Sequence, residues 1–144
     1  TDLVIHDPRD GRAVIWKESG FDSRARGTQG EFGLMQLMDF SAQSWADSQQ
    51  LGNLTHDELL DPKTNILAGC FYLSRLSRRY GNTDNPLAYA LADYNAGRGN
   101  VLKWMKGAAV TNSIEFLEKC EFPSTRAYVQ SILRKSADYR SHFD

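Results

Sequence analysis

The sequence has no long hydrophobic run and little cysteine, and each shortage excludes a class of protein. No apolar stretch in its 144 residues approaches the ~20 that crossing a bilayer requires, which predicts no stable membrane insertion. The amino-terminal segment is polar and acidic, so no signal peptide is recognisable in this chain. Two cysteines are too few for a disulfide scaffold. Cys70 lies in an apolar helical stretch and is expected to be a buried thiol, while a disulfide with Cys120 stays an open alternative.

The chain also lacks an excess of either charge. Lys and Arg number 17 against 18 Asp and Glu, a formal net charge of −1. Binding to nucleic acid depends on concentrated basic residues, so no nucleic-acid partner is expected. The basic cluster of Arg75, Arg78 and Arg79 is interpreted as the solvated face of a helix.

Motifs for metals and nucleotide cofactors are missing as well. The three histidines, His6, His56 and His142, are far apart in the sequence, and no Cys-x-x-Cys or His-Glu-x-x-His spacing occurs. The phosphate-binding pattern Gly-x-x-x-x-Gly-Lys and the nucleophile turn Gly-x-Ser-x-Gly do not occur either. We therefore expect no metal and no cofactor.

What the sequence does contain is a series of helical segments without alternating strand patterns. Its length fits one compact domain spanning residues 1–144. Asp61-Pro62 and Asn85-Pro86 each predict a helix start, with the first residue of the pair as the N-cap. Helices are predicted at residues 12–19, 34–39 continuing into 41–51, 62–80, 86–95, 100–105 and from 124 onward, the last with Val129, Ile132, Leu133 and Phe143 on one stripe. The fold class is mainly α, with a glycine-rich irregular loop or small hairpin over residues 20–33.

One carboxylate stands in an unusual place. Glu18 follows Val14, Ile15 and Trp16 at the end of a predicted core helix, which Gly20 ends. A carboxyl group among apolar side chains loses hydration, which raises its pKa and lets it donate a proton near neutral pH. From this helix alone, a solvent-exposed glutamate at a helix end is the simpler interpretation.

Four blocks in order change that interpretation. They are Glu18-Ser19-Gly20-Phe21-Asp22, then Gly33-Leu34-Met35-Gln36, then Asp61-Pro62 with Asn65-Ile66, Gly69 and Tyr72-Leu73, and last the Ala-Leu-Ala-Asp-Tyr-Asn-Ala-Gly of residues 90–97, with a weaker fifth block at 122–129. In this order and spacing the sequence resembles the catalytic domain of the soluble lytic transglycosylases, which is related to goose-type lysozyme. The resemblance implies a lysozyme-like helical fold and makes Glu18 the catalytic acid.

The activity that the resemblance implies is the cleavage of peptidoglycan glycan strands. The family cleaves the β-1,4 bond between N-acetylmuramic acid and N-acetylglucosamine and leaves 1,6-anhydromuramoyl ends. Glu18 alone would act as acid and then as base toward the sugar's own 6-hydroxyl. The expected location is the bacterial periplasm or cell envelope, or a phage acting on the cell wall. The residues implied for substrate binding are Gln36, Met38, Tyr72, Tyr94, Asn95, Glu118 and Tyr128.

Several of these residues have a structural alternative. Met38 and Tyr72 lie at helical spacing with other apolar residues, which also suits core packing. Asn95, just before Ala96-Gly97, also suits a helix cap. Glu118 lies in a loosely matching segment and is equally well a surface glutamate.

Two departures from the family pattern fall between Glu18 and Gln36. Gly27 stands where many members have a serine, so a side-chain contact to the substrate's acetamido group is missing or comes from the backbone. Glu31 stands where the family usually has a small residue, and it adds a second carboxylate. Facing the cleft, Glu31 could activate a water and make the protein a lysozyme-like muramidase. On the rim of the loop, which is the interpretation we favour, it has no catalytic role.

Two other classes of function stay open. One is a noncatalytic glycan-binding domain, although such a module has no need to keep Glu18. The other is an adaptor domain whose partner is an envelope-spanning secretion, pilus or phage assembly apparatus.

Overall fold

The computed structural model describes residues 7–142, which form eight α-helices and one short 3-10 helix. The helices are α1 (Pro8–Ser19), α2 (Asp39–Ser48), α3 (His56–Leu60), α4 (Pro62–Arg79), α5 (Pro86–Ala96), α6 (Arg98–Trp104), the 3-10 helix η1 (Gly107–Val110), α7 (Ser113–Lys119) and α8 (Pro123–His142). These described residues contain no strand, only two isolated bridges that close the glycine-rich loop, Arg26 with Phe32 and Phe32 with Leu37. The predicted mainly α class is confirmed.

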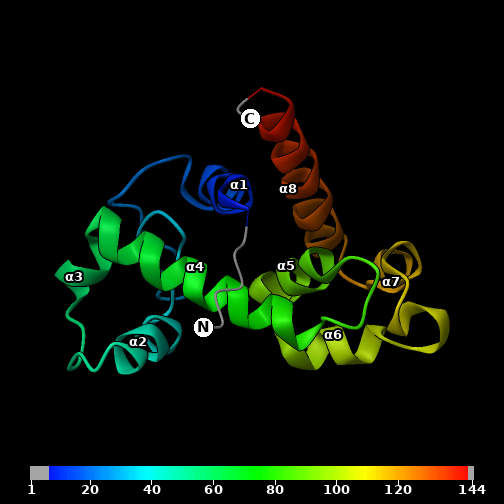
Figure 1. Ribbon diagram of the computed structural model, residues 1–144, viewed down its shortest axis with the longest axis horizontal. Helices are drawn as coiled ribbons and strands as arrows, with labels where there is room; N and C mark the ends of the chain where they lie inside the picture. Colours follow the sequence, from blue (N-terminus) through cyan, green and yellow to red (C-terminus); the bar gives the residue numbers. More distant parts are fainter. Residues whose placement is uncertain (1–6, 143–144) are drawn as a thin grey trace.

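The long helix α4 crosses the molecule between two groups of helices (Figure 1). Helices α2 and α3 lie at one end of α4, and α5, α6 and α7 lie at the other. Helices α1 and α8, which are far apart in the sequence, lie side by side, and α8 also packs on α5. The apolar core draws on all of these central helices and includes the fully buried side chains of Val14, Leu73, Tyr89 and Ile132.

Asp61 and Pro62 begin α4 in the way the sequence predicts. Asp61 caps the helix by accepting a hydrogen bond from the Thr64 N–H at 3.0 Å, and Pro62 takes the first helical position. Helix α5 also begins at its predicted proline, but the side chain of Asn85 makes no capping hydrogen bond. The predicted start of α5 is confirmed and Asn85 takes the predicted N-cap position, but without the side-chain hydrogen bond that Asp61 makes.

Helix α1 ends as predicted and begins earlier than predicted. Gly20 ends it in the left-handed region, with a φ of 60°, where glycine has no steric penalty. The helix starts at Pro8 rather than at residue 12, because the Asp7 carboxylate accepts the Arg9 N–H at 3.0 Å and caps it.

The helix predicted over residues 34–39 does not form. Gln36 has a φ of 50°, and Phe32 and Leu37 exchange two backbone hydrogen bonds of 2.9 Å. A residue in the left-handed region cannot continue a right-handed helix, so α2 begins only at Asp39. Two short helices, α3 and α7, were not predicted from the sequence. The predicted stripe position Phe143 lies outside the described residues.

Both cysteines are free, so no disulfide joins Cys70 to Cys120. Cys120 is buried, whereas Cys70, which the sequence predicts to be buried, is only partly so. Polar contacts join α8 to α1. The buried Asp10 on α1 accepts hydrogen bonds from Ser136 and, at 3.2 Å, from Arg140 on α8. No helix within residues 7–142 combines the length and the hydropathy that crossing a bilayer takes.

Candidate active site

Glu18 stands in the last turn of α1 and meets α8 across the helix interface. The Tyr128 hydroxyl on α8 donates a hydrogen bond of 2.7 Å to Oε2 of Glu18. Tyr128 is only 6% exposed, and the Glu18 side chain is partly buried. The hydroxyl therefore fixes the orientation of the carboxyl group and leaves its second oxygen, Oε1, to face other groups.

Burial makes Glu18 a much weaker acid than an ordinary glutamate. It raises the pKa of Glu18 from 4.5 to about 7. The hydrogen bond from Tyr128 and the charge of Lys17 act in the opposite direction and lower the pKa, while the negative charge of Glu31 raises it further. A carboxyl group with a pKa near 7 can both give and take a proton at neutral pH.

The loop that follows Glu18 is held by two amide side chains. Gln36 donates both of its Nε2 hydrogens to loop carbonyls, to Ala25 O at 3.1 Å and to Gly33 O at 2.8 Å. Its side-chain oxygen is then the atom left to meet a ligand. The predicted site residue Gln36 thus also has a structural role within the loop.

Asn65 on α4 anchors the same loop and was missed as a functional residue by the sequence analysis. Its fully buried side chain accepts the Met35 N–H and donates to Phe32 O and Leu59 O, each at 2.8 Å. Gly33 packs against it with a φ of 77°, and a Cβ there would lie 2.3 Å from the Asn65 nitrogen. The signal in the sequence was the Asn65-Ile66 pair, which we read only as part of a family block.

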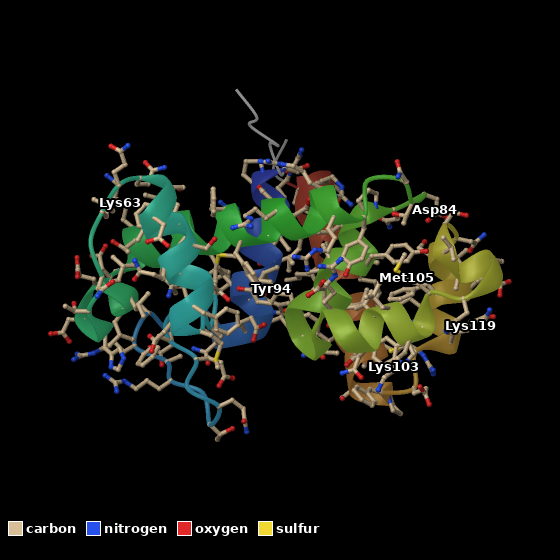
Figure 2. All side chains as sticks on the ribbon, turned by 90° about the horizontal axis from the view of Figure 1, so that it is seen from below. Lys63, Asp84, Tyr94, Lys103, Met105 and Lys119 are labelled. Carbon is tan, nitrogen blue, oxygen red and sulfur yellow. The ribbon has the colours of Figure 1, made fainter. Side chains whose placement is uncertain are left out.

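Four of the predicted substrate-binding residues line one small hollow of about 140 Å³, which lies between the loop, α2, α4 and α5. Its lining residues are Gln36, Leu37, Met38, Phe40, Ser41, Tyr72, Asp93, Tyr94 and Gly97. The Tyr72 and Tyr94 rings are 5.6 Å apart, and Figure 2 shows Tyr94 near the middle of the molecule. Phe40, which the sequence analysis did not select, is 68% exposed at the edge of this hollow.

Tyr94 connects the hollow to the acid. Its hydroxyl donates to Met35 O at 2.5 Å, which holds the ring in place. Burial raises the pKa of Tyr94, and the negative charge of Glu18 raises it further. Tyr94 thus lines the hollow and also responds to the charge of Glu18.

Asp93 lines the hollow, but its buried carboxylate is a structural group. It accepts hydrogen bonds from Tyr80 and, at 3.0 Å, from Arg79. Arg75, Arg78 and Arg79 are exposed as predicted, but Arg79 is thus also an ion-pair partner.

Asn95 and Glu118 lie outside this hollow. Asn95 is exposed, and its Oδ1 accepts a hydrogen bond of 2.7 Å from the Thr125 hydroxyl, which joins α5 to α8. The residue that caps the end of α5 is Gly97, not Asn95. Glu118 is exposed and lines a different hollow of about 340 Å³ with Ile114, Leu117, Arg126 and Gln130.

Glu31 is partly buried, and Oε1 of its carboxylate accepts the Gln29 N–H at 2.6 Å. Its negative charge contributes to the raised pKa of Glu18. That Glu31 lies on the rim of the loop without a catalytic role stays a prediction.

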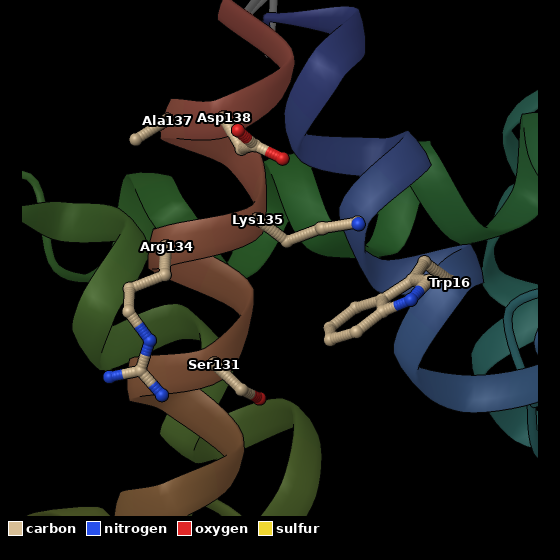
Figure 3. A pocket seen from close by; sticks show the side chains of 6 residues that line it. All are labelled: Trp16, Ser131, Arg134, Lys135, Ala137 and Asp138. Atoms are coloured by element: carbon tan, nitrogen blue, oxygen red, sulfur yellow. The ribbon is translucent and has the colours of Figure 1, made fainter.

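Another hollow, of about 610 Å³, opens between α1 and α8 (Figure 3). Lys135 reaches from α8 over the Trp16 ring on α1, with its Nζ 5.0 Å from the ring centre. None of the predicted site residues lines this hollow, whereas four of them line the small one, so we do not assign it to the site. No group of three His, Cys, Asp or Glu side chains within residues 7–142 could hold a metal ion.

Comparisons with known proteins agree with this geometry. A sequence family described as the transglycosylase SLT domain matches residues 6–116. The soluble lytic murein transglycosylase of Escherichia coli K12 is 33% identical over 130 residues, which is 89% of this chain and 20% of that protein. The chain therefore spans about a fifth of the length of this relative.

Two solved structures are similar over nearly the whole chain. An inactive variant of lytic transglycosylase Slt from Pseudomonas aeruginosa has a TM-score of 0.83 at 30% identity, over 94% of this chain and 22% of that one. The 70 kDa soluble lytic transglycosylase from Escherichia coli has a TM-score of 0.83 at 31% identity, over 96% of this chain and 22% of that one.

Proposed function

The chain belongs to the transglycosylase SLT family, and from this premise we propose that it cleaves peptidoglycan as a lytic transglycosylase. The proposed bond is the β-1,4 link between N-acetylmuramic acid and N-acetylglucosamine, and the proposed product carries a 1,6-anhydromuramoyl end. The observation that carries the proposal is the partly buried carboxyl group of Glu18, held by Tyr128 and with a pKa of about 7. We treat residues 1–144 as one catalytic domain.

Glu18 performs both proton transfers of the proposed reaction. Its carboxyl proton passes to the glycosidic oxygen as the bond from that oxygen to the anomeric carbon breaks. The 6-hydroxyl of the same muramic acid residue then attacks the anomeric carbon and gives its proton to the Glu18 carboxylate. The ring closes without water, and Glu18 returns to its starting protonation state. Because nucleophile and electrophile belong to one sugar, the attack has the proximity advantage of an intramolecular reaction.

The residues of the small hollow bind the sugar next to the cleaved bond. The free side-chain oxygen of Gln36 accepts hydrogen bonds from sugar hydroxyl or acetamido groups. Met38 and the rings of Tyr72 and Tyr94 offer apolar surface to the sugar faces. Asn95 and Glu118 contact more distant parts of the glycan strand, since they lie outside the hollow.

Because the proposed substrate is peptidoglycan, the proposed location is the bacterial periplasm or cell envelope, or a phage that acts on the cell wall. A partner from a secretion, pilus or phage assembly apparatus would direct the same activity to one place on the wall. A second activity, hydrolysis by a water that Glu31 activates, is supported only by the charge of Glu31, which contributes to the raised pKa of Glu18.

Digestion of purified peptidoglycan tests the proposal. Mass spectrometry of the released muropeptides should find products one water lighter than reducing muropeptides, and Glu18→Gln should lose activity by several orders of magnitude while keeping its fold. Products with reducing ends would show hydrolysis, and the protein would then be a muramidase rather than a transglycosylase. No cleavage by a folded sample that still binds glycan strands would favour a binding or adaptor domain.

A further inference from the structure

Phe40 is a large apolar side chain that the fold leaves in water. It is the second residue of α2 and is 68% exposed, which among the large apolar side chains that the structure describes only Ile114 exceeds. Helix α2 packs inward through small buried residues, Ser41, Ala42 and Ala46. Phe40 is not part of the apolar core that residues 7–142 form. The fold therefore gains little from this ring, and its presence calls for another explanation.

The ring stands at the edge of the small hollow to which we assign the substrate. Met38 and Ser41, close to Phe40 in the sequence, line the same hollow. Ser41 is only 3% exposed, so the start of α2 places a small polar side chain inside the hollow and a large apolar one at its rim. Farther in, the hollow is lined by the rings of Tyr72 and Tyr94, whose centres are 5.6 Å apart. Phe40 thus adds an exposed third ring to an aromatic lining.

The hollow is too small to hold a length of glycan. Its volume is about 140 Å³, which is the room that roughly five water molecules occupy in the liquid. Each sugar of a peptidoglycan strand carries a ring, a hydroxymethyl group and an acetamido group, so one sugar more than fills this space. A strand bound here has to pass over the rim, and Phe40 is the exposed ring at that rim.

The chemistry of a sugar face matches that of an exposed phenyl ring. A β-1,4-linked pyranose carries its hydroxyl groups around the edge and C–H groups on its two faces. The face of an aromatic ring is slightly negative and attracts these C–H groups. A phenyl ring also has no polar group of its own that would lose water when a sugar covers it.

Charge and size argue against other occupants of this ring. The side chain of Asp39, next to Phe40 in the chain, is 69% exposed, and a carboxylate is repelled by an anionic lipid surface. A protein partner is recognised by a continuous apolar patch of several hundred Å². Among the described residues that line the hollow, Phe40 is the one exposed large apolar side chain. A single ring has the size of one sugar face.

We propose that Phe40 is a specificity-determining residue whose ring stacks on the sugar next to the one in the hollow, so that the site prefers glycan strands to short fragments. The inference rests on the proposed function of the hollow as a sugar site. Stacking on a sugar that does not react strengthens the bound substrate and the transition state alike. Loss of the ring therefore raises KM and leaves kcat nearly unchanged.

The test compares Phe40→Ala with Phe40→Tyr, which keeps a ring. The probe is glycan strands freed of their stem peptides, bound to protein that also carries Glu18→Gln so that no strand is cleaved. Covering one ring face removes roughly 60 Å² of apolar surface from water, so Phe40→Ala should bind the strands about tenfold more weakly. Phe40→Tyr should bind within about twofold of the parent. In active protein, Phe40→Ala should raise KM about tenfold and keep kcat within about twofold.

A matched control is Leu102→Ala on α6. Leu102 is 50% exposed and lines none of the hollows described above, so its loss should change neither affinity nor KM. Urea unfolding should give Phe40→Ala the midpoint of the wild type, because the ring is outside the core. NMR supplies a direct readout, since sugar C–H resonances should shift upfield on binding to protein with a ring at residue 40 and not to Phe40→Ala.

Other results would overturn the inference. Folded Phe40→Ala that binds strands as tightly as the parent would remove Phe40 from the glycan site and leave the proposed function standing. A loss that appears only when stem peptides are attached would assign the ring to the peptide. Self-association, or binding to anionic phospholipid vesicles, that Phe40→Ala abolishes at unchanged glycan affinity would assign it to another occupant. No binding of strands by any folded protein, the parent included, would overturn the proposed function itself.

Discussion

Replacing Glu18 by glutamine should stabilise the fold above neutral pH while it removes the activity. The fold raises the pKa of Glu18 from 4.5 to about 7, so the folded state holds this proton more tightly than the unfolded chain does. Below pH 4.5 the carboxyl group is protonated in both states, so its burial does not lower the free energy of unfolding. Between pH 4.5 and 7 the unfolded chain loses the proton first, so the stability of the wild type falls as pH rises, and above 7 the cost is complete.

The raised pKa sets an upper limit of about 3 kcal/mol on this cost. Glu18 is partly exposed, and solvent screens the effect, so we expect about 1–2 kcal/mol. Glutamine has no proton to lose and can still accept the hydrogen bond from Tyr128. The difference in free energy of unfolding between Glu18→Gln and the wild type should therefore grow from near zero at pH 4 to its full value at pH 8.

Urea unfolding at pH 4, 6 and 8 measures this difference directly. The control Glu115→Gln removes a carboxylate from α7 and should show no such growth with pH. A Glu18→Gln variant whose advantage is constant or falls between pH 4 and 8 would refute the reasoning, because the acid would then not be destabilised by its burial.

Two further changes test the supports of the site. Tyr128→Phe removes the hydrogen bond that favours ionised Glu18, so the alkaline limb of the kcat/KM profile should move up by about one pH unit. A limb that stays in place or moves down would contradict the role of Tyr128. Asn65→Ala removes three buried hydrogen bonds and should lower the free energy of unfolding by about 3 kcal/mol in urea titrations, whereas a loss below about 1 kcal/mol would mean that the loop does not depend on Asn65.

Much of the helical framework could be predicted because its signals are local. The Asp61-Pro62 pair and Gly20 mark helix ends through the chemistry of single residues, and the structure confirms both. Glu18 could be selected because an acid at the end of an apolar helix is unusual, and the family blocks then gave it a role. The pKa of about 7 follows from the same local apolar surroundings together with α8.

What could not be predicted depends on contacts between distant segments. The apolar run at residues 34–39 reads as a helix, but Asn65 holds Met35 and Phe32 in a turn from 30 or more positions away. Asn95 reads as a cap, but its side chain is bound to Thr125 on another helix. The carboxylate of Glu31 folds back over Gly27, and no sequence pattern predicts this arrangement.

The contact between Glu18 and Tyr128 joins residues that are 110 positions apart, and this separation matters while the protein is being made. In a growing chain Glu18 is synthesised before α8, and its carboxyl group is then hydrated and ionised, so it has no proton to donate. The carboxyl group is buried and keeps its proton only after α8 has been synthesised and has packed on α1. The acid of the proposed reaction is thus absent from a nascent or unfolded chain, and it forms only when the fold is complete.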